Sequence, residues 1–264
     1  MNFFDNEEEI INWFQTTVDH SEVFFPLCTD DAIRVFEAVH NQEKWIKWKN
    51  SSGKDAPPPD FYSNEYGLMM DVMRVDDHSR VSATNKLINP TNQRESELQK
   101  ELKESGLLKG LPNVTKTFIN AITDLPTAED HNYQFYYTGF ERIVKKHIKS
   151  IPLYRKNHPE HLVVFFVFDE SSAYVQVDDK NLIAKGIKAG EAFDGETYCQ
   201  FLDKKMVDVF KGTDIDYLIW YTPFKHYEST CPFELPKVCV YDVKRYTYED
   251  VIDYPEELIM STEE

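Results

Sequence analysis

The chain has 264 residues, of which 41% are hydrophobic and 14% aromatic, and this content excludes disorder over most of its length. Its 29 Lys and Arg residues against 46 Asp and Glu give a formal net charge of -17, which repels polyanions at long range. The charge disfavours nucleic acid as a partner, although a local basic site needs only a few phosphate contacts.

Cysteine usage and the chain start predict a soluble, cytoplasmic protein. The cysteines form no close CxxC pair and no zinc clamp with a nearby histidine, so we interpret them as reduced thiols. The amino terminus is acidic where a secretory signal is basic, and no apolar run approaches the ~20 residues that span a bilayer, so we expect no membrane partner. No Walker loop, GxGxxG, GxSxG, HExxH or kinase signature occurs, and we expect no organic cofactor.

The first 50 residues are predicted to be helical. Asp5 and Glu8 form a helix-start signature, followed by apolar residues at helical spacing. A second helix is predicted to begin near Thr29, and the helical start runs to about Lys49. Residues 50–60 carry Ser, Gly and a run of Pro, and we expect a loop there.

Strands and helices then alternate. The patterns predict a strand at 66–75, a polar helix at 92–105, a strand at 113–122, a helix at 133–151 that Pro152 ends, strands at 162–168 and 173–177, a helix at 197–210, and strands at 216–221 and 237–244. The run 162–168 is continuously apolar, which is typical of a central strand covered on both faces. The alternating run 173–177 follows a turn and is predicted to be its hairpin partner.

This order of elements predicts an α/β fold, with α+β as the alternative. We expect a mixed β-sheet with helices on its faces, in a single domain over residues 1–264. Its parts are an N-terminal helical extension at 1–50, an α/β core at 60–246 and an acidic tail at 247–264. The tail contains no Lys or Arg, and it is either a solvated end or a partner-binding segment.

The last predicted strands carry a cluster of acids. Alternation in 238–244 places Asp242 and Lys244 on one face, where an acid and a lysine could hold a metal and an anion. Asp214 and Asp216 stand at the start of the preceding strand, and Glu196 comes before the helix that leads to it. The alternative for Asp242 and Lys244 is a surface ion pair on an edge strand.

The order of these residues resembles the PD-(D/E)xK restriction-endonuclease-like nucleases, through the segments GTDIDYLIWYTP and VCVYDVKRY. In that family one acid opens a strand, and an acid and a lysine two residues apart lie on the neighbouring strand. The resemblance covers residues 196–246 and implies Mg²⁺-dependent phosphodiester hydrolysis. It implies Asp216, Asp242 and Lys244 as the catalytic group, and as metal ligands Asp214, Asp216, Asp242 and Glu196.

A second candidate site combines Asp71, Asp124 and His131. Alternation in 68–75 places Asp71 among apolar residues, so its carboxylate needs a partner; a hydrogen-bonded structural acid is favoured over a metal ligand. Asp124 and His131 lie in a loop between a predicted strand and a long helix, where open α/β sheets place ligand sites. Capping of that helix is the favoured alternative.

The last candidate binding site is a basic segment. Its residues could bind phosphates or an acidic partner, or form the solvated face of an amphipathic helix. They are Lys145, Lys146, Lys149, Arg155 and Lys156. The leading functional prediction is a metal-dependent nuclease, with Mg²⁺ as cofactor. The alternative is a non-catalytic binding or regulatory protein whose acidic surface engages a basic protein partner.

Overall fold

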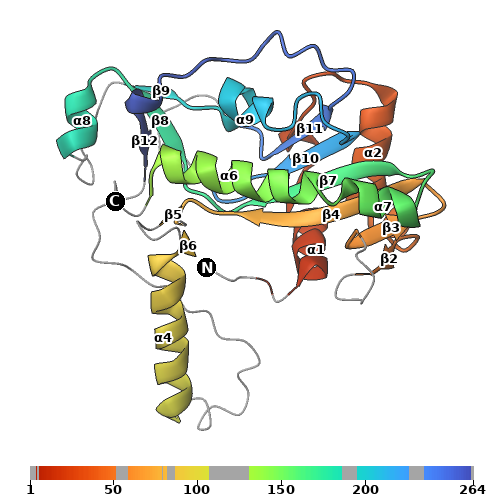
Figure 1. Cartoon of the computed structure of the whole chain (residues 1–264), viewed down its shortest axis with the longest axis horizontal. Coiled ribbons are helices and arrows are strands. Elements are labelled where there is room, and N and C mark those ends of the chain that lie inside the picture. The colour runs from red at the N-terminus through yellow and green to blue at the C-terminus, as the bar shows by residue number, and fades with distance from the viewer. Residues whose placement is uncertain are drawn as a thin grey trace.

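The computed structural model describes residues 4, 6–51, 59–78, 80–81, 87–106, 131–185, 195–225 and 235–262. A mixed seven-stranded sheet runs through them in the order β1-β11-β10-β7-β4-β3-β2 (Figure 1), and it confirms the predicted α/β fold. Its strands are β1 Val23–Phe24, β2 Lys49–Asn50, β3 Phe61–Ser63, β4 Leu68–Val75, β7 Leu162–Asp169, β10 Tyr217–Tyr221 and β11 Val238–Asp242.

The centre of the sheet is parallel. β7 pairs in parallel with β4 on one side and with β10 on the other. β7 is buried along almost its whole length, as its continuously apolar sequence predicts for a central strand. Antiparallel β11 and β3 continue the sheet outward from β10 and β4. The carboxyl ends of β4, β7 and β10 therefore meet at one edge.

Helices cover both faces of this sheet. The helices α1 Glu7–Thr17 and α2 Asp30–His40 pack on one face, and α6 Tyr133–Ile148, α7 Ile151–Asn157 and α9 Lys204–Asp208 pack on the other. The side chains of Asn6 and Thr29 cap α1 and α2, which places the second helix where the sequence predicts it. The first 50 residues, predicted to be an extension, instead form a layer of the fold, with the short α3 Gln42–Trp45 and both edge strands.

Two predicted elements in the second half of the chain differ from the structure. β8 Tyr174–Val177 does not pair with β7 but lies between β9 Gly195–Thr197 and β12 Ile259–Ser261 in a separate three-stranded sheet. Alternation predicts which side chains are buried, but it does not identify the strand's partner. The helix expected at 197–210 is reduced to η3 Gln200–Leu202 and α9, because Asp203 caps α9 and interrupts it.

The predicted acidic tail is also part of the fold. β12 pairs with β8, and Tyr248 is 8% exposed within the core on the α6 side. Pro152 likewise lies in the first turn of α7, where it is well tolerated, and α6 has already ended at Ile148. The remaining described elements are η1 His20–Glu22, β5 Arg80–Val81, β6 Leu87–Ile88, α4 Pro90–Glu104, α8 Lys180–Lys185 and η4 Glu256–Leu258.

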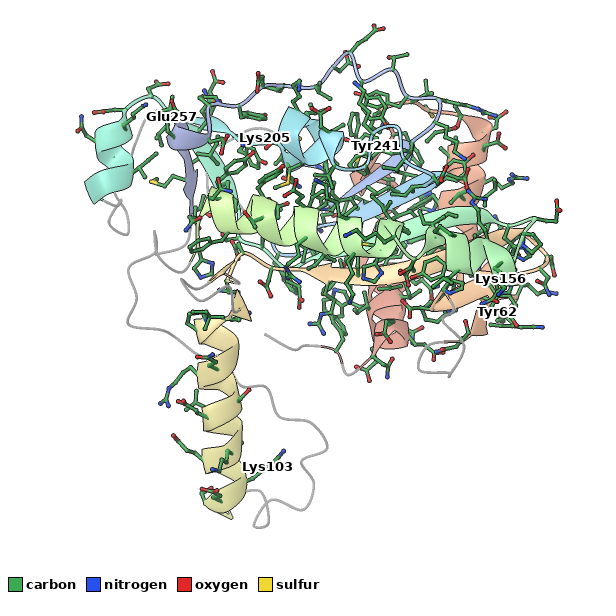
Figure 2. All side chains as sticks on the ribbon, viewed as in Figure 1. Tyr62, Lys103, Lys156, Lys205, Tyr241 and Glu257 are labelled. Atoms are coloured by element: carbon green, nitrogen blue, oxygen red, sulfur yellow. The ribbon has the colours of Figure 1, made fainter. Side chains whose placement is uncertain are left out.

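The predicted polar helix corresponds to α4, which projects from the body of the molecule (Figure 1). Figure 2 shows side chains filling the space between α6 and the sheet, whereas Lys103 of α4 points into solvent. Among the described residues, no helix combines the length and apolar character that crossing a bilayer requires. The strand expected at 113–122 lies outside the described residues.

Candidate metal centre

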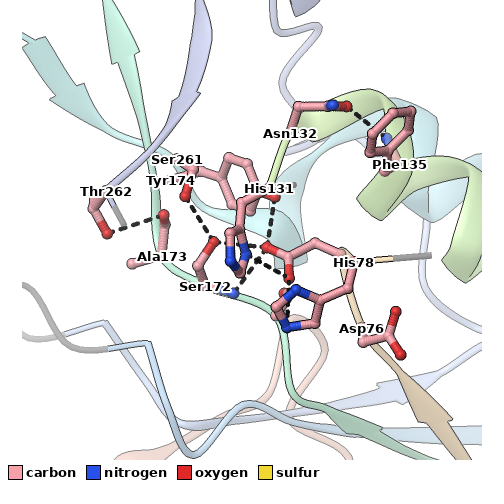
Figure 3. A network of polar contacts seen from close by, with 12 residues as sticks. Asp76, His78, His131, Asn132, Phe135, Ser172, Ala173, Tyr174, Ser261 and Thr262 are labelled. Carbon is pink, nitrogen blue, oxygen red and sulfur yellow. Dashed lines mark hydrogen bonds and ion pairs between the residues drawn. The ribbon is translucent and has the colours of Figure 1, made fainter. Parts of the chain in front are cut away.

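The carboxyl ends of the parallel strands carry a cluster of polar side chains. Ligands of open α/β folds bind at this edge, where loops from neighbouring strands converge. Asp77 and His78 follow β4, Ser171 and Ser172 follow β7, and Lys225 follows β10. His131, which lies just before α6, reaches the same cluster (Figure 3).

Asp77 is the centre of this cluster and is fully buried. Its Oδ2 accepts hydrogen bonds from the Ser172 backbone N–H at 3.1 Å, the Ser172 hydroxyl at 2.6 Å and the Tyr174 hydroxyl at 2.7 Å. Its Oδ1 faces two imidazoles, with Nδ1 of His131 at 3.2 Å and Nε2 of His78 at 4.0 Å. One carboxylate oxygen is thus held by hydroxyl and backbone donors, and the other is presented to two histidines.

The surroundings of Asp77 favour its ionised form. Burial alone would raise the pKa of this carboxyl group. The hydrogen bond from His131, the charges of His131 and His78, and the hydrogen bond from Ser172 outweigh burial and hold the pKa well below its usual value. An anionic ligand oxygen is therefore available at neutral pH.

The three side chains fit a metal ion. Asp77, His78 and His131 each offer one ligand atom, and these atoms lie within 4.8 Å of one another. Donors bound to one ion at about 2.0–2.2 Å stand roughly 3–3.5 Å apart, so the Asp77–His131 separation already fits, and Nε2 of His78 has to move at least about 0.5–1 Å closer to Oδ1 of Asp77. Two imidazoles and a carboxylate suit a transition metal better than Mg²⁺.

Lys225 supports the centre from the side of β7 and β10. Its side chain is only 3% exposed, and its ammonium lies 3.9 Å from Asp169. The ammonium donates to the Ser171 hydroxyl at 2.6 Å and to the Ser172 carbonyl at 2.8 Å. Ser172 is therefore held by Lys225 on one side while it donates to Asp77 on the other. Outer partners of this kind orient metal ligands.

A hollow of about 380 Å³ opens along α4. The described residues that line it are Asn89, Gln93, Ser96 and Glu97. The Asn89 amide donates to Oδ2 of Asp76 at 3.3 Å, and Asp76 immediately precedes Asp77. The hollow is thus connected to the loop that carries the candidate ligands.

The acid–lysine pattern of the predicted nuclease site forms an ion-pair cluster instead. Oδ2 of Asp216 accepts from the Val163 backbone N–H at 2.8 Å and from the Arg155 guanidinium at 3.1 Å. Its Oδ1 pairs with Lys244. β11 ends at Asp242, and the turn that follows carries Lys244 to Asp216. Each oxygen of Asp216 is therefore already matched by a donor.

Asp242 lies on the opposite face of the sheet from Asp216. It is the register partner of Tyr217, which packs with the side chains beneath α1 and α2, and Asp216 is one residue before Tyr217. Oδ1 of Asp242 accepts from the Arg245 backbone N–H at 3.2 Å, and the Arg245 guanidinium lies 3.7 Å from Oδ2. The prediction that Asp216 and Asp242 share an ion is wrong, because alternation separates them.

The other two predicted ligands are also apart. Asp214 is exposed, and Glu196 is exposed on β9 of the smaller sheet. Among the described residues, the His, Cys, Asp and Glu side chains that gather around a common point are those of Asp77, His78 and His131. The predicted ligand set of Asp214, Asp216, Asp242 and Glu196 is therefore not assembled.

The second predicted site is divided between two places. Asp71 is 4% exposed, accepts from the Tyr154 hydroxyl at 2.7 Å and pairs with His147, in line with the favoured alternative of a hydrogen-bonded acid. His131 belongs to the candidate metal centre, where it binds Asp77. Asp77 follows Asp71 by six residues, which corresponds to roughly 20 Å along an extended chain. Asp124 lies outside the described residues.

The basic segment is partly neutralised. Lys145 pairs with Glu141 at 2.7 Å on α6, and Arg155 is bound to Asp216. Lys146, Lys149 and Lys156 are exposed. Two of the five predicted phosphate-binding cations are therefore occupied by acids of this chain.

Asp77 and His78 are the site residues that sequence reasoning missed. The signal was their position, since Asp76, Asp77 and His78 directly follow a predicted strand. Polar residues at the carboxyl end of a parallel strand are typical ligand-site residues.

A comparison of the chain with protein-family models, curated proteins and solved structures finds no match.

Proposed function

We propose that the protein binds a divalent transition-metal ion through Asp77, His78 and His131 and uses it in hydrolysis. The observation that carries this proposal is the asymmetry of Asp77, whose Oδ2 is saturated by hydroxyl and backbone donors while Oδ1 faces both imidazoles. A ligand set of two histidines and one carboxylate leaves coordination positions open for water and substrate.

Hydrolysis follows from the chemistry of such a set. A bound ion lowers the pKa of coordinated water toward neutrality and polarises the bond under attack. The side chains of Ser172 and Tyr174 hold Asp77 in place, and the hollow along α4 reaches the ligand loop through the hydrogen bond from Asn89 to Asp76. Phosphodiesters are the substrate class to test first, because the sequence resembles metal-dependent nucleases, although at residues that the structure separates.

Metal binding is tested by titrating the purified protein with Co²⁺ and recording its visible absorption spectrum. We expect saturable binding of one ion, lost in Asp77→Asn and weakened at least tenfold in His78→Ala and His131→Ala. His158→Ala is the matched control, because His158 packs against Tyr62 and His161 elsewhere. Equal binding by the wild type and all these variants would refute the site.

Hydrolysis is tested separately, with single- and double-stranded DNA and RNA in the presence of Zn²⁺, Mn²⁺ or Mg²⁺. We expect cleavage that Asp77→Asn abolishes and that Asp242→Ala and Lys244→Ala retain. Activity that depends on Asp242 and Lys244 but not on Asp77 would contradict catalysis at the metal centre and would support the residues that the nuclease resemblance implies. Metal binding without cleavage of any of these substrates would contradict phosphodiester hydrolysis but would still support the metal centre.

The competing class is a binding or regulatory protein that engages a basic partner through its acidic surface, and the acidic tail gives it little support. Residues 247–262 contribute β12 to the smaller sheet and buried Tyr248 to the core. A segment engaged in this way is not free to wrap a basic partner.

A further inference from the structure

Two carboxyl groups face each other across β3 and β4, away from the metal centre. The register pairs Phe61 with Met70, so the residue before Phe61, Asp60, lies opposite Asp71. Side chains at opposite positions on one face of an antiparallel pair are close neighbours, with Cβ atoms roughly 4.5–5.5 Å apart. The two carboxyl groups are therefore direct neighbours, and the charge of Asp71 opposes the ionisation of Asp60.

The remaining contacts of the pair come from three further elements. The Val72 backbone N–H donates to Oδ2 of Asp60 at 2.8 Å. The Tyr154 hydroxyl of α7 donates to Oδ2 of Asp71 at 2.7 Å, and Nδ1 of His147 on α6 contacts the same oxygen. The charge of Glu7 on α1 also acts on Asp60 and opposes its ionisation.

No strong cation offsets the two acids. Among the described residues, neither Asp60 nor Asp71 contacts a Lys or Arg side chain; the basic group at the pair is His147. Two carboxylates this close repel each other when both are ionised, so retaining one proton is the stable arrangement.

We propose that Asp60 and Asp71 form a proton-binding site that holds one shared proton at neutral pH, and that His147 connects this site to solvent. Burial and the charge of Asp71 raise the pKa of Asp60 to about 8. The His147 side chain is 21% exposed against 5% for Asp71, so the imidazole is the contact of Asp71 that reaches solvent. Nothing in this proposal depends on the metal centre.

Loss of the proton places two negative charges opposite each other where β3 joins the sheet. Like charges at directly opposed positions destabilise strand pairing. Because β2 is attached through β3, the site links alkaline pH to loosening of this edge of the sheet.

The test is a pH titration of the full-length protein, labelled with ¹³C at aspartate and followed by the carboxyl carbon shifts in NMR. We expect one aspartate signal to titrate near pH 8 in the wild type. That signal should be absent in Asp60→Asn, move down by about one pH unit or more in Asp71→Asn, and stay in place in the control Asp208→Asn.

The wild-type titration alone can overturn the proposal, whether or not the variants fold. If every aspartate signal completes its titration below about pH 6, no proton is held at neutral pH. An Asp60 midpoint that does not change in Asp71→Asn would also contradict a proton shared between the two residues.

Discussion

Several buried carboxylates in this protein are matched by neutral hydroxyl or indole donors. Asp203 accepts from Tyr133 at 2.7 Å and Tyr198 at 2.6 Å, and Asp169 accepts from the Trp220 indole at 2.9 Å. Such donors satisfy a buried acid without a metal. Asp77 differs because its Oδ1 faces two imidazoles, whereas Oδ1 of Asp203 accepts from the Lys205 backbone N–H, and this difference distinguishes a ligand from a structural acid.

The role of Tyr174 can be separated from its contribution to stability. Tyr174→Phe removes one donor from Asp77, and we expect metal affinity to fall about 10–100-fold, because outer partners orient the ligand. The measurement is a Co²⁺ or Zn²⁺ titration alongside urea unfolding. Tyr198→Phe removes a comparable hydroxyl from Asp203 and is the control. Equal affinity losses in the two variants would show a general weakening of the core.

The stability of the protein should depend on Asp60 in a defined pH range. The pKa of Asp60 is raised from 3.8 to about 8, first by burial and then by Asp71. Between these values the folded chain retains a proton that the unfolded chain releases, so this contribution to stability falls as pH rises and is lost as pH passes through about 8.

Asp60→Asn should make the free energy of unfolding fall less steeply as pH rises from about 4 to about 8. Urea unfolding at a series of pH values in this range measures the slope, of which one proton accounts for at most about 1.4 kcal/mol per pH unit. Asp208→Asn should keep the wild-type slope. Identical slopes in wild type and Asp60→Asn would contradict this role.

At the scale of elements, the acid Asp216, which the sequence predicts as an Mg²⁺ ligand, instead forms ion pairs that connect strands and a helix. Asp216 joins the amino end of β7, through Val163, to α7 through Arg155 and to the turn after β11 through Lys244. The side chain of Asp216 is 7% exposed, whereas that of Lys244 is 50% exposed. These contacts hold the amino-terminal edge of the parallel strands together.

The two ends of this cluster should behave differently on mutation. Asp216→Ala leaves the buried Val163 backbone N–H without its acceptor and removes the ion pair with Arg155, and we expect a loss of about 1–3 kcal/mol in unfolding free energy. Lys244→Ala removes a half-exposed partner and should cost less than about 1 kcal/mol. Chemical denaturation measures both. A larger loss in Lys244→Ala than in Asp216→Ala would contradict this ranking.

Local patterns predict elements well where one physical cause dominates. The apolar run that became β7 and the capped start of α2 are cases of this kind, since burial and a Thr29 cap determine them locally. The pattern of residues 173–177 does not identify the partners of β8, because β12 is distant in the chain and β9 follows only after α8. Pro152 predicts the end of a helix, although proline also suits the first turn of a new one.

At the scale of the whole molecule, the C-terminal segment closes the side of the fold that carries the metal centre. β12 pairs with β8, and the Ser261 hydroxyl lies 2.9 Å from that of Ser172. Ser172 in turn donates to Asp77. The end of the chain therefore supports a ligand far from it in sequence.

Removal of residues 259–264 tests this connection. Loss of β12 exposes the edge of β8 and removes a partner of Ser172, so we expect the melting temperature to fall by roughly 4–8 °C, from a loss of about 2 kcal/mol. Metal affinity should fall about tenfold. Calorimetry and metal titration measure both effects. Removal of 263–264 alone leaves β12 intact and serves as the control; a comparable effect there would contradict a role of the strand.

The candidate site could be predicted only in fragments. Loop position and alternation predict His131 and Asp71, but Asp77 and His78 join His131 only through the long connection between β4 and α6. The pattern predicts Asp242 and Lys244 as one site because it extends the strand through residue 244, whereas β11 ends at Asp242. Convergence of side chains depends on where strands stop, which local sequence patterns determine poorly.

The most direct test of the central claim is the X-ray absorption spectrum of the zinc-loaded protein. We predict one zinc ion with two imidazole ligands and oxygen ligands from a carboxylate and water, and loss of one imidazole signal in His131→Ala. A spectrum with sulfur ligands or oxygen alone, or no stoichiometric zinc, would contradict a metal centre formed by Asp77, His78 and His131.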